Sequence, residues 1–229
     1  MALDIYVMPI WRFKVGDFNS PIQTNLGIRP KIVTAEGINE PAVKSGWVAR
    51  WRARRQVAAI RKAVESTNGV PAKWKDDGQV VYAEQSRGME PLRAYALWLD
   101  LLDRLPEFKP PPGGDYYKHP VWQLSHERPL SCPHLVEHDC YCGYFLPCDF
   151  EKPVQVEAYR IQSWSFSRSV SSALRVRKEL AFVAEHLSVP DTHEYPSDDP
   201  RVEVKSAFLQ MQKVVDLSIM HGLPIIFWG

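Results

Sequence analysis

The chain has 229 residues, of which 45% are hydrophobic and 24% are charged, as in ordinary globular domains, so a disordered chain is excluded. The formal net charge of +1 provides no general attraction to nucleic acid or to an anionic membrane, so either partner would need a local patch. Asp4 interrupts the apolar N-terminal run, which therefore does not fit a signal peptide, and no run approaches the roughly 18 apolar residues of a membrane span. We therefore expect a cytoplasmic protein.

The first half of the chain predicts two strands and two helices. Residues 3–10 form a short apolar run that favours a buried strand. Over residues 47–64 the apolar side chains recur on one face of a helix, and residues 79–84 follow an Asp-Gly turn as a second strand. Pro91 begins a further helix that extends to residue 105.

The second half predicts two more strands and a long helix. Residues 143–147 form an apolar run, and residues 154–159 alternate between apolar and polar side chains, as a half-buried strand does. Ser167 or Ser169 is expected to cap a helix over residues 170–187, whose apolar residues recur at helical spacing.

The C-terminal segment predicts a helix followed by a strand. Asp198 or Asp199 caps the helix, which ends at His221 before Gly222. Residues 224–228 then form a continuous apolar run. Continuous runs at both chain ends, rather than alternation, indicate strands that are covered on both faces. The expected fold is α/β or α+β, a small mixed sheet with the N- and C-terminal strands central and flanked by about four helices.

Residues 106–148 interrupt this pattern. The stretch is rich in proline, shows no sustained period, and exceeds the roughly 15 residues that structureless loops reach in compact domains. It also carries Tyr116, Tyr117 and Trp122, which do not suit a solvated linker. We expect a single globular domain over residues 1–229, with this segment inserted as an ordered, irregular excursion that something holds in place.

The excursion contains all 4 cysteines of the chain. Together with two histidines they supply the side chains that bind Zn²⁺ best, and four of these ligands would form a structural zinc site that holds the excursion on the domain. The paired Cys-x-x-Cys knuckles of zinc ribbons are absent, and Cys140-x-Cys142 is a tighter chelate. The candidate ligands are Cys132, His134, His138, Cys140, Cys142 and Cys148.

The segment from His134 to His138 also reads His-x-x-Glu-His. On a helix the two histidines would project from one face and share a metal, and Glu137 would deprotonate the metal-bound water. The motif resembles that of insulin-degrading metallopeptidases, which carry it on a long helix and take a further glutamate ligand from downstream. This resemblance implies a zinc-dependent hydrolase with Glu137 as the catalytic base.

A third interpretation of the same segment needs no metal. Free cysteines are among the most often buried residues and act as small apolar side chains. The two histidines would then be ordinary core or surface residues whose ring nitrogens are hydrogen-bonded.

A basic stretch lies in the helix predicted over residues 47–64. It contains no acidic residue, and Trp47 and Trp51 accompany it, a pattern typical of surfaces that bind nucleic acid. The alternative is a solvated helix whose arginines pair with acids elsewhere, which the net charge near zero favours. The residues that would contact nucleic acid are Arg50, Arg54, Arg55 and Arg61.

Residues 2–6, 143–147 and 223–227 resemble small bacterial and phage proteins of unknown function, which often begin Met-Gly-Leu-Asp-Met-Tyr. The resemblance implies a bacterial or phage protein and no particular activity. Three functions follow from the residues: a non-enzymatic accessory protein that binds a protein or a small molecule through its excursion, with or without a zinc staple, a zinc-dependent hydrolase, and a nucleic-acid-binding module. We favour the first.

Overall fold

A computed structural model describes residues 3–18, 32–34, 37–39, 46–86, 88–111, 114–124, 128–139, 142–161, 164–187, 199 and 201–228. Its centre is a six-stranded mixed sheet with the strand order β4-β1-β8-β5-β7-β6. These strands are β1 (Leu3–Val7), β4 (Tyr82–Ser86), β5 (Cys142–Leu146), β6 (Val154–Ile161), β7 (Trp164–Ser172) and β8 (Ile225–Trp228). The β5 and β7 strands pair in parallel, and the other neighbours are antiparallel. A separate antiparallel pair consists of β2 (Ile32–Thr34) and β3 (Gly37–Asn39).

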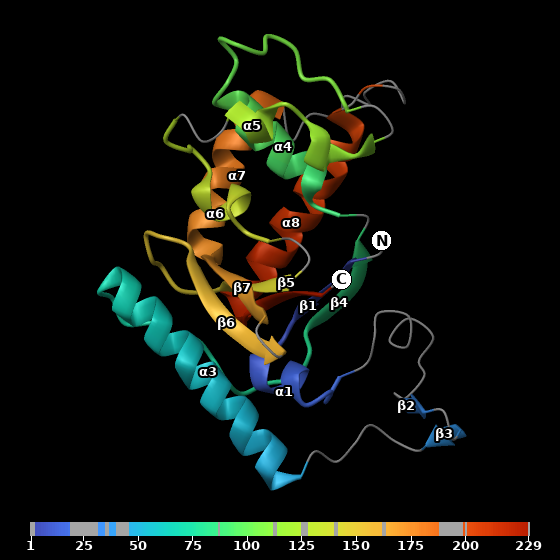
Figure 1. Ribbon diagram of the computed structural model, residues 1–229, viewed down its shortest axis with the longest axis vertical. Coiled ribbons are helices and arrows are strands. Elements are labelled where there is room, and N and C mark those ends of the chain that lie inside the picture. Colours follow the sequence, from blue (N-terminus) through green and yellow to red (C-terminus); the bar gives the residue numbers. More distant parts are fainter. Residues whose placement is uncertain are drawn as a thin grey trace.

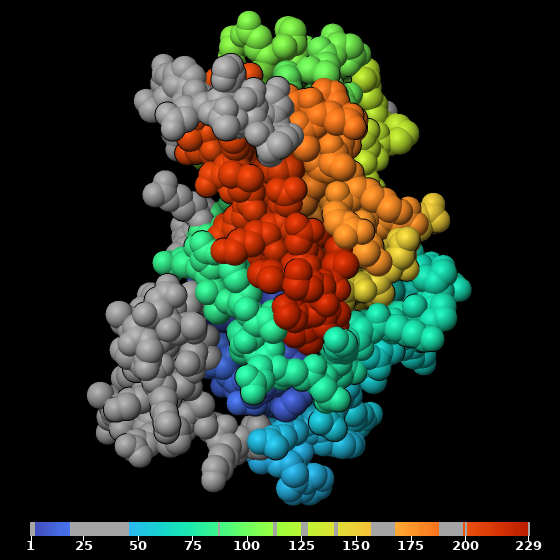
Figure 2. Space-filling view, turned by 180° about the vertical axis from the view of Figure 1, so that it is seen from behind, coloured from blue at the N-terminus to red at the C-terminus, as the bar shows by residue number. Residues whose placement is uncertain are grey.

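Helices cover both faces of the sheet (Figure 1). On one face lie α4 (Glu90–Leu99), α5 (Val121–Leu124), α6 (Pro133–Val136), α7 (Ala173–Leu187) and α8 (Arg201–His221), with the short 3₁₀ helix η2 (Tyr116–Lys118). On the other face lie α1 (Ile10–Lys14) and α3 (Trp47–Asn68). Seen from behind (Figure 2), the surface of α8 runs down the molecule beside that of α7, and α3 lies at the lower right.

Each terminal strand supplies side chains to both faces of the sheet. In β1, Ile5 and Val7 point into the core under α4, α7 and α8, which we call the α8-side core. Tyr6 points into the core under α1 and α3, which we call the α3-side core. In β8, Phe227 and Ile226 divide in the same way. Because both faces are covered, neither strand has a solvent-facing row of polar residues.

The predicted fold class is confirmed. The β1 and β8 strands lie side by side within the mixed sheet, and four of the helices in the described part of the chain, α3, α4, α7 and α8, are ten residues or longer. None of the described helices is long and apolar enough to cross a membrane.

Several predicted boundaries are wrong. The N-terminal strand ends at Val7 and not at residue 10, and the helix that contains Pro91 ends at Leu99 and not at residue 105. The segment expected to start a helix at residue 170 is the end of β7, and α7 begins only at Ala173. The serines that were interpreted as helix caps alternate along this strand in the sequence, and Ser169 and Ser171 are buried in it. The capping residue is Ser172, whose hydroxyl accepts a hydrogen bond from the Arg175 backbone N–H at 3.1 Å.

The described part of the excursion over residues 106–148 packs against the body of the protein. Tyr116, Val121, Leu135 and Val136 are buried members of the α8-side core. Their burial stabilises a stretch that has little regular backbone structure of its own.

Candidate functional site

Glu179 of α7 holds the Cys- and His-rich segment in place. One of its carboxylate oxygens accepts a hydrogen bond from the backbone N–H of His134 at 2.9 Å, and the other accepts one from Leu135 at 2.8 Å. These N–H groups begin α6 and have no partner within the helix. Burial raises the pKa of Glu179 to about 7. A carboxylate therefore occupies the anchoring role for which the sequence suggested zinc.

Both ring nitrogens of His134 are used in hydrogen bonds to the backbone. Nδ1 accepts a hydrogen bond from the Ser172 N–H at 3.1 Å, which leaves Nε2 to donate to the Glu151 carbonyl at 2.9 Å. Burial lowers the pKa of this imidazole to about 4. A histidine with this bonding has no lone pair left for a metal.

His138 is sealed inside the α8-side core. Its ring stacks on Phe145 with the centroids 3.7 Å apart, and Nδ1 lies 3.0 Å from the Ser171 hydroxyl. Nε2 is buried without a hydrogen-bond partner among the described residues, and burial lowers the pKa of the ring well below its ordinary value. Gly143 of β5 lies directly against this ring, where a Cβ atom would collide with it.

The described cysteines do not converge on one point. Cys132 lies in the α8-side core and Cys148 in the α3-side core, on opposite faces of the sheet. Burial raises the pKa of Cys132 and raises the pKa values of Cys142 and Cys148 to about 11, so these thiols are protonated at neutral pH. Cys140 falls outside the described residues. Within the described ranges no group of three or more His, Cys, Asp or Glu side chains could hold a metal.

The arrangement needed by a zinc hydrolase is not formed either. The α6 helix has a single turn and ends at Val136, so His134 and His138 do not share a helical face. Glu137 is exposed at the end of this turn, whereas both imidazoles point into the protein. Glu137 is therefore not placed between the two rings, as the base of a zinc hydrolase would be.

The arginines of α3 serve different purposes. Arg61 donates hydrogen bonds to the Ala72 carbonyl and to Asp76 and thus fixes the segment that follows the helix. Arg54 lies over the Trp11 ring and Arg55 over the Trp51 ring, while Arg50 is exposed on the first turn. The helix presents a basic outer surface on the α3 side of the sheet.

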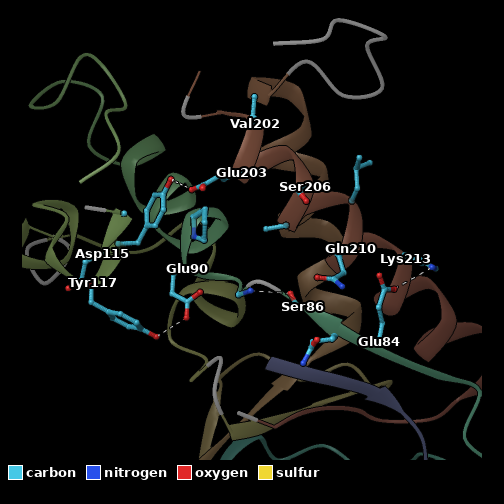
Figure 3. A pocket seen from close by; sticks show the side chains of 17 residues that line it. Glu84, Ser86, Glu90, Asp115, Tyr117, Val202, Glu203, Ser206, Gln210 and Lys213 are labelled. Atoms are coloured by element: carbon cyan, nitrogen blue, oxygen red, sulfur yellow. Dashed lines mark hydrogen bonds and ion pairs between the residues drawn. The ribbon is translucent and has the colours of Figure 1, made fainter. Parts of the chain in front are cut away.

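A cleft on the α8 side gathers carboxylates that are far apart in the sequence. It has a volume of about 730 Å³ and lies between the end of β4, the start of α4, η2 and the N-terminal half of α8. Figure 3 shows the side chains that surround it. We call it the acidic cleft after its four carboxylates, which belong to Glu84, Glu90, Asp115 and Glu203. Lys213 is the only cationic side chain among the described residues that line it.

Two of these carboxylates lie in the first turns of helices. Glu90 begins α4 and Glu203 lies near the start of α8, where the helix dipole favours negative charge. The Tyr117 hydroxyl donates to Glu90 at 3.4 Å, and the Tyr116 hydroxyl donates to Glu203 at 2.8 Å. The acidic cleft therefore concentrates negative charge, and tyrosine hydroxyls fix the positions of these two carboxylates.

The other two carboxylates lie close to lysines. Asp115 forms an ion pair with Lys118 at 2.9 Å, and Glu84 lies 3.7 Å from the Lys213 ammonium. Both pairs are largely exposed and contribute little to stability. No local pattern in the sequence predicts the cleft, because its walls come from three separate segments of the chain.

Comparisons with known proteins give one result. No curated protein and no solved structure matches the chain. A family model described as "Putative DNA-mimic protein" matches residues 1–227. This description corrects all three functions that we inferred from the sequence, since it fits neither a zinc-stapled accessory protein nor a hydrolase nor a nucleic-acid-binding module. Because the match covers nearly the whole chain, the protein belongs to this DNA-mimic family.

Proposed function

We propose that this protein imitates DNA toward a DNA-binding protein and that the acidic cleft presents the imitating charges. The observation that carries the proposal is the family match over residues 1–227. The partner is then a protein, and it works where DNA is found, which agrees with the cytoplasmic location expected from the sequence.

Carboxylates can replace phosphates in such a contact. A DNA-binding protein presents arginine and lysine side chains that neutralise backbone phosphates, and these cations also pair with carboxylates. The acidic cleft offers Glu84, Asp115 and Glu203 at its surface and holds Glu90 in its wall; the nearby cations are Lys213 in the described lining and Lys118 beside Asp115. It is therefore suited to a basic surface.

The overall charge of +1 is compatible with this role because the charges are separated in space. The cations of α3 lie on the α3 side of the sheet, and the acidic cleft lies on the α8 side. A basic partner is attracted by the cleft and repelled by α3, so the separation favours one orientation of approach.

The rim of the cleft supplies apolar contact area as well as charge. Tyr117, Val202 and Leu209 line it and are more than a third exposed. Aromatic and apolar groups around charged ones are typical of protein interfaces. This combination favours a folded protein surface over a free basic peptide as the natural partner.

A competition experiment tests the proposal. Immobilised protein is incubated with a nuclease-treated extract of the source cells, and bound proteins are released with a duplex oligonucleotide and identified by mass spectrometry. We expect a DNA-binding protein in the released fraction, with an affinity that falls as salt increases. Capture of proteins that do not bind DNA, or that duplex DNA cannot displace, would contradict the proposal.

Matched variants locate the contact. The double variant Glu84→Gln/Glu203→Gln removes two cleft charges, whereas Glu137→Gln/Glu185→Gln removes two exposed charges elsewhere. We expect the cleft variant to bind the released protein about tenfold or more weakly and the control variant to bind like the wild type. Equal binding by both variants would show that the contact lies outside the cleft.

A further inference from the structure

We infer that Tyr116 is a positioning residue of the acidic cleft. Its hydroxyl holds the Glu203 carboxylate in the orientation that pairs with a cationic side chain of the partner. The inference rests on the proposed function of the cleft. The family match points to a basic ligand, and the structure shows which groups fix the carboxylates that would meet it.

The Tyr116 hydroxyl is a fixed donor. The ring is 5% exposed and belongs to the α8-side core, so its position is set by packing. The hydroxyl donates to Glu203 at 2.8 Å, and burial together with this hydrogen bond raises the pKa of Tyr116. The phenol therefore keeps its proton at neutral pH and remains a donor.

Glu203 would be mobile without this hydrogen bond. It is exposed in the first turn of α8, and a free glutamate there samples several rotamers. The tyrosine restricts these rotamers and leaves the negative charge in place, since a neutral phenol does not neutralise a carboxylate. Ordering a side chain on binding costs about 0.5 to 1.5 kcal/mol, and here much of that ordering precedes binding.

The same device recurs at two other carboxylates of the cleft. The Tyr117 hydroxyl donates to Glu90 at 3.4 Å, which Figure 3 shows as a dashed line, and the Tyr82 hydroxyl donates to Glu84. The Tyr116 bond has good geometry and a buried donor, whereas the Tyr117 bond is long and its ring is 47% exposed. Tyr116 is therefore the residue for which positioning is expected to matter most.

The test uses a defined cationic probe, an octa-arginine peptide, titrated into the purified full-length protein at low salt. The variants are Tyr116→Phe, Glu203→Gln and the combination of the two. Tyr95→Phe is the control, because Tyr95 is a buried tyrosine of the same core whose hydroxyl donates to the His186 carbonyl instead of a cleft carboxylate. The free energy of unfolding is measured for every variant.

We expect Tyr116→Phe to weaken peptide binding about threefold to tenfold, and Tyr95→Phe to leave it unchanged. In the Glu203→Gln background the Tyr116→Phe substitution should have no further effect, because a residue that acts through Glu203 shows complete coupling to it. A purely structural role would change the stability of the variants without this coupling.

Two other results overturn different statements. If Glu203→Gln weakens binding but Tyr116→Phe does not, or if the two effects add, the positioning role is refuted and the proposed function of the cleft stands. If the wild type fails to bind the peptide, or if Glu203→Gln binds as tightly as the wild type, the cleft does not read cations and the inference falls together with the role assigned to the cleft.

Discussion

The segment over residues 132–138 and the acidic cleft lie on the same side of the sheet, but their polar groups are bonded in opposite ways. In the segment, His134 uses both ring nitrogens in hydrogen bonds to the backbone, and the N–H groups of His134 and Leu135 end on Glu179. In the cleft, the carboxylate of Glu203 is exposed, and among the described residues the Tyr116 hydroxyl is its hydrogen-bond donor.

This difference separates groups that build the fold from groups that face a partner. A buried polar group whose bonds are all made stabilises one arrangement of the chain. An exposed carboxylate that is held by one neighbour keeps most of its capacity for an incoming cation. The number of reactive side chains in a short stretch of sequence is therefore a poor guide to where a protein binds.

Glu179→Ala is expected to have the largest effect on stability. It removes the acceptors of two buried backbone N–H groups, and each unsatisfied donor costs about 1 to 3 kcal/mol, so the free energy of unfolding should fall by about 2 to 6 kcal/mol. Urea denaturation at pH 7 measures this loss. Glu185→Ala is the control on the same helix, because Glu185 is exposed and should change stability by less than about 0.5 kcal/mol. Equal effects would show that the carboxylate does not anchor α6.

Gly143→Ala is expected to have the next largest effect. A Cβ atom there would collide with the His138 ring and would lie 2.7 Å from the Ser169 carbonyl oxygen, so the free energy of unfolding should fall by about 1 to 3 kcal/mol. Strand propensity alone predicts the opposite, since alanine is favoured over glycine within a strand by about 0.5 to 1 kcal/mol. The sign of the change, measured by thermal and urea denaturation, therefore decides whether Gly143 is packed against His138 and Ser169 as the structure shows.

The fold was predictable to the extent that apolar periodicity records it. The runs at residues 3–10 and 224–228 identified two inner strands because a strand covered on both faces has no polar row. The boundary at residue 170 was misplaced because serines suit a helix cap and a strand equally well, and their alternation in β7 was outweighed by the apolar helical pattern that follows. The long helices lie where they were predicted, although α4 ends at Leu99 and α7 begins at Ala173, because each carries a buried stripe, such as Ala53, Val57, Ile60 and Val64 of α3.

The site was not predictable in the same way. The cleft joins Glu84 and Glu90 to Asp115 and Glu203, and only the packing of α4, η2 and α8 brings these residues together. The sole local signals were acidic residues in the first turns of two helices, which are common in any protein. The conspicuous Cys and His residues indicated the wrong region, because spacing shows which side chains are close in sequence and not whether they converge in space or, as for His134, already use their ring nitrogens.

The pH dependence of the free energy of unfolding tests whether burial shifts the pKa values of Glu179, His134 and His138 as described. Burial lowers the pKa of His134 to about 4 and that of His138 well below 6.5, so their stabilising contribution is present above pH 6.5 and is lost as the pH falls toward 4. Burial raises the pKa of Glu179 from 4.5 to about 7, so its contribution is present below pH 4.5 and is lost as the pH rises through 7. The two effects oppose each other between pH 4.5 and 6.5.

Glu179→Gln removes one of these opposing effects. Stability of the variant should therefore rise more steeply than that of the wild type between pH 4.5 and 6.5, because the amide does not titrate and only the histidine contribution remains. Urea denaturation across this range gives the two curves. Parallel curves would show that Glu179 is not perturbed by burial and would weaken the contrast with the cleft.

Glu203→Gln completes the comparison with the smallest expected effect on folding. The amide oxygen can still accept the Tyr116 hydroxyl, and the side chain is exposed, so the free energy of unfolding should change by less than about 0.5 kcal/mol. Binding of a basic partner should nevertheless weaken, because the substitution removes a negative charge that would pair with a cation of the partner. Glu179→Gln should show the reverse, a marked loss of stability in a protein that still binds when folded. The same substitution on the same side of the sheet thus distinguishes the two regions, and a large stability loss for Glu203→Gln would mean that the cleft carboxylates, like Glu179, hold the fold together.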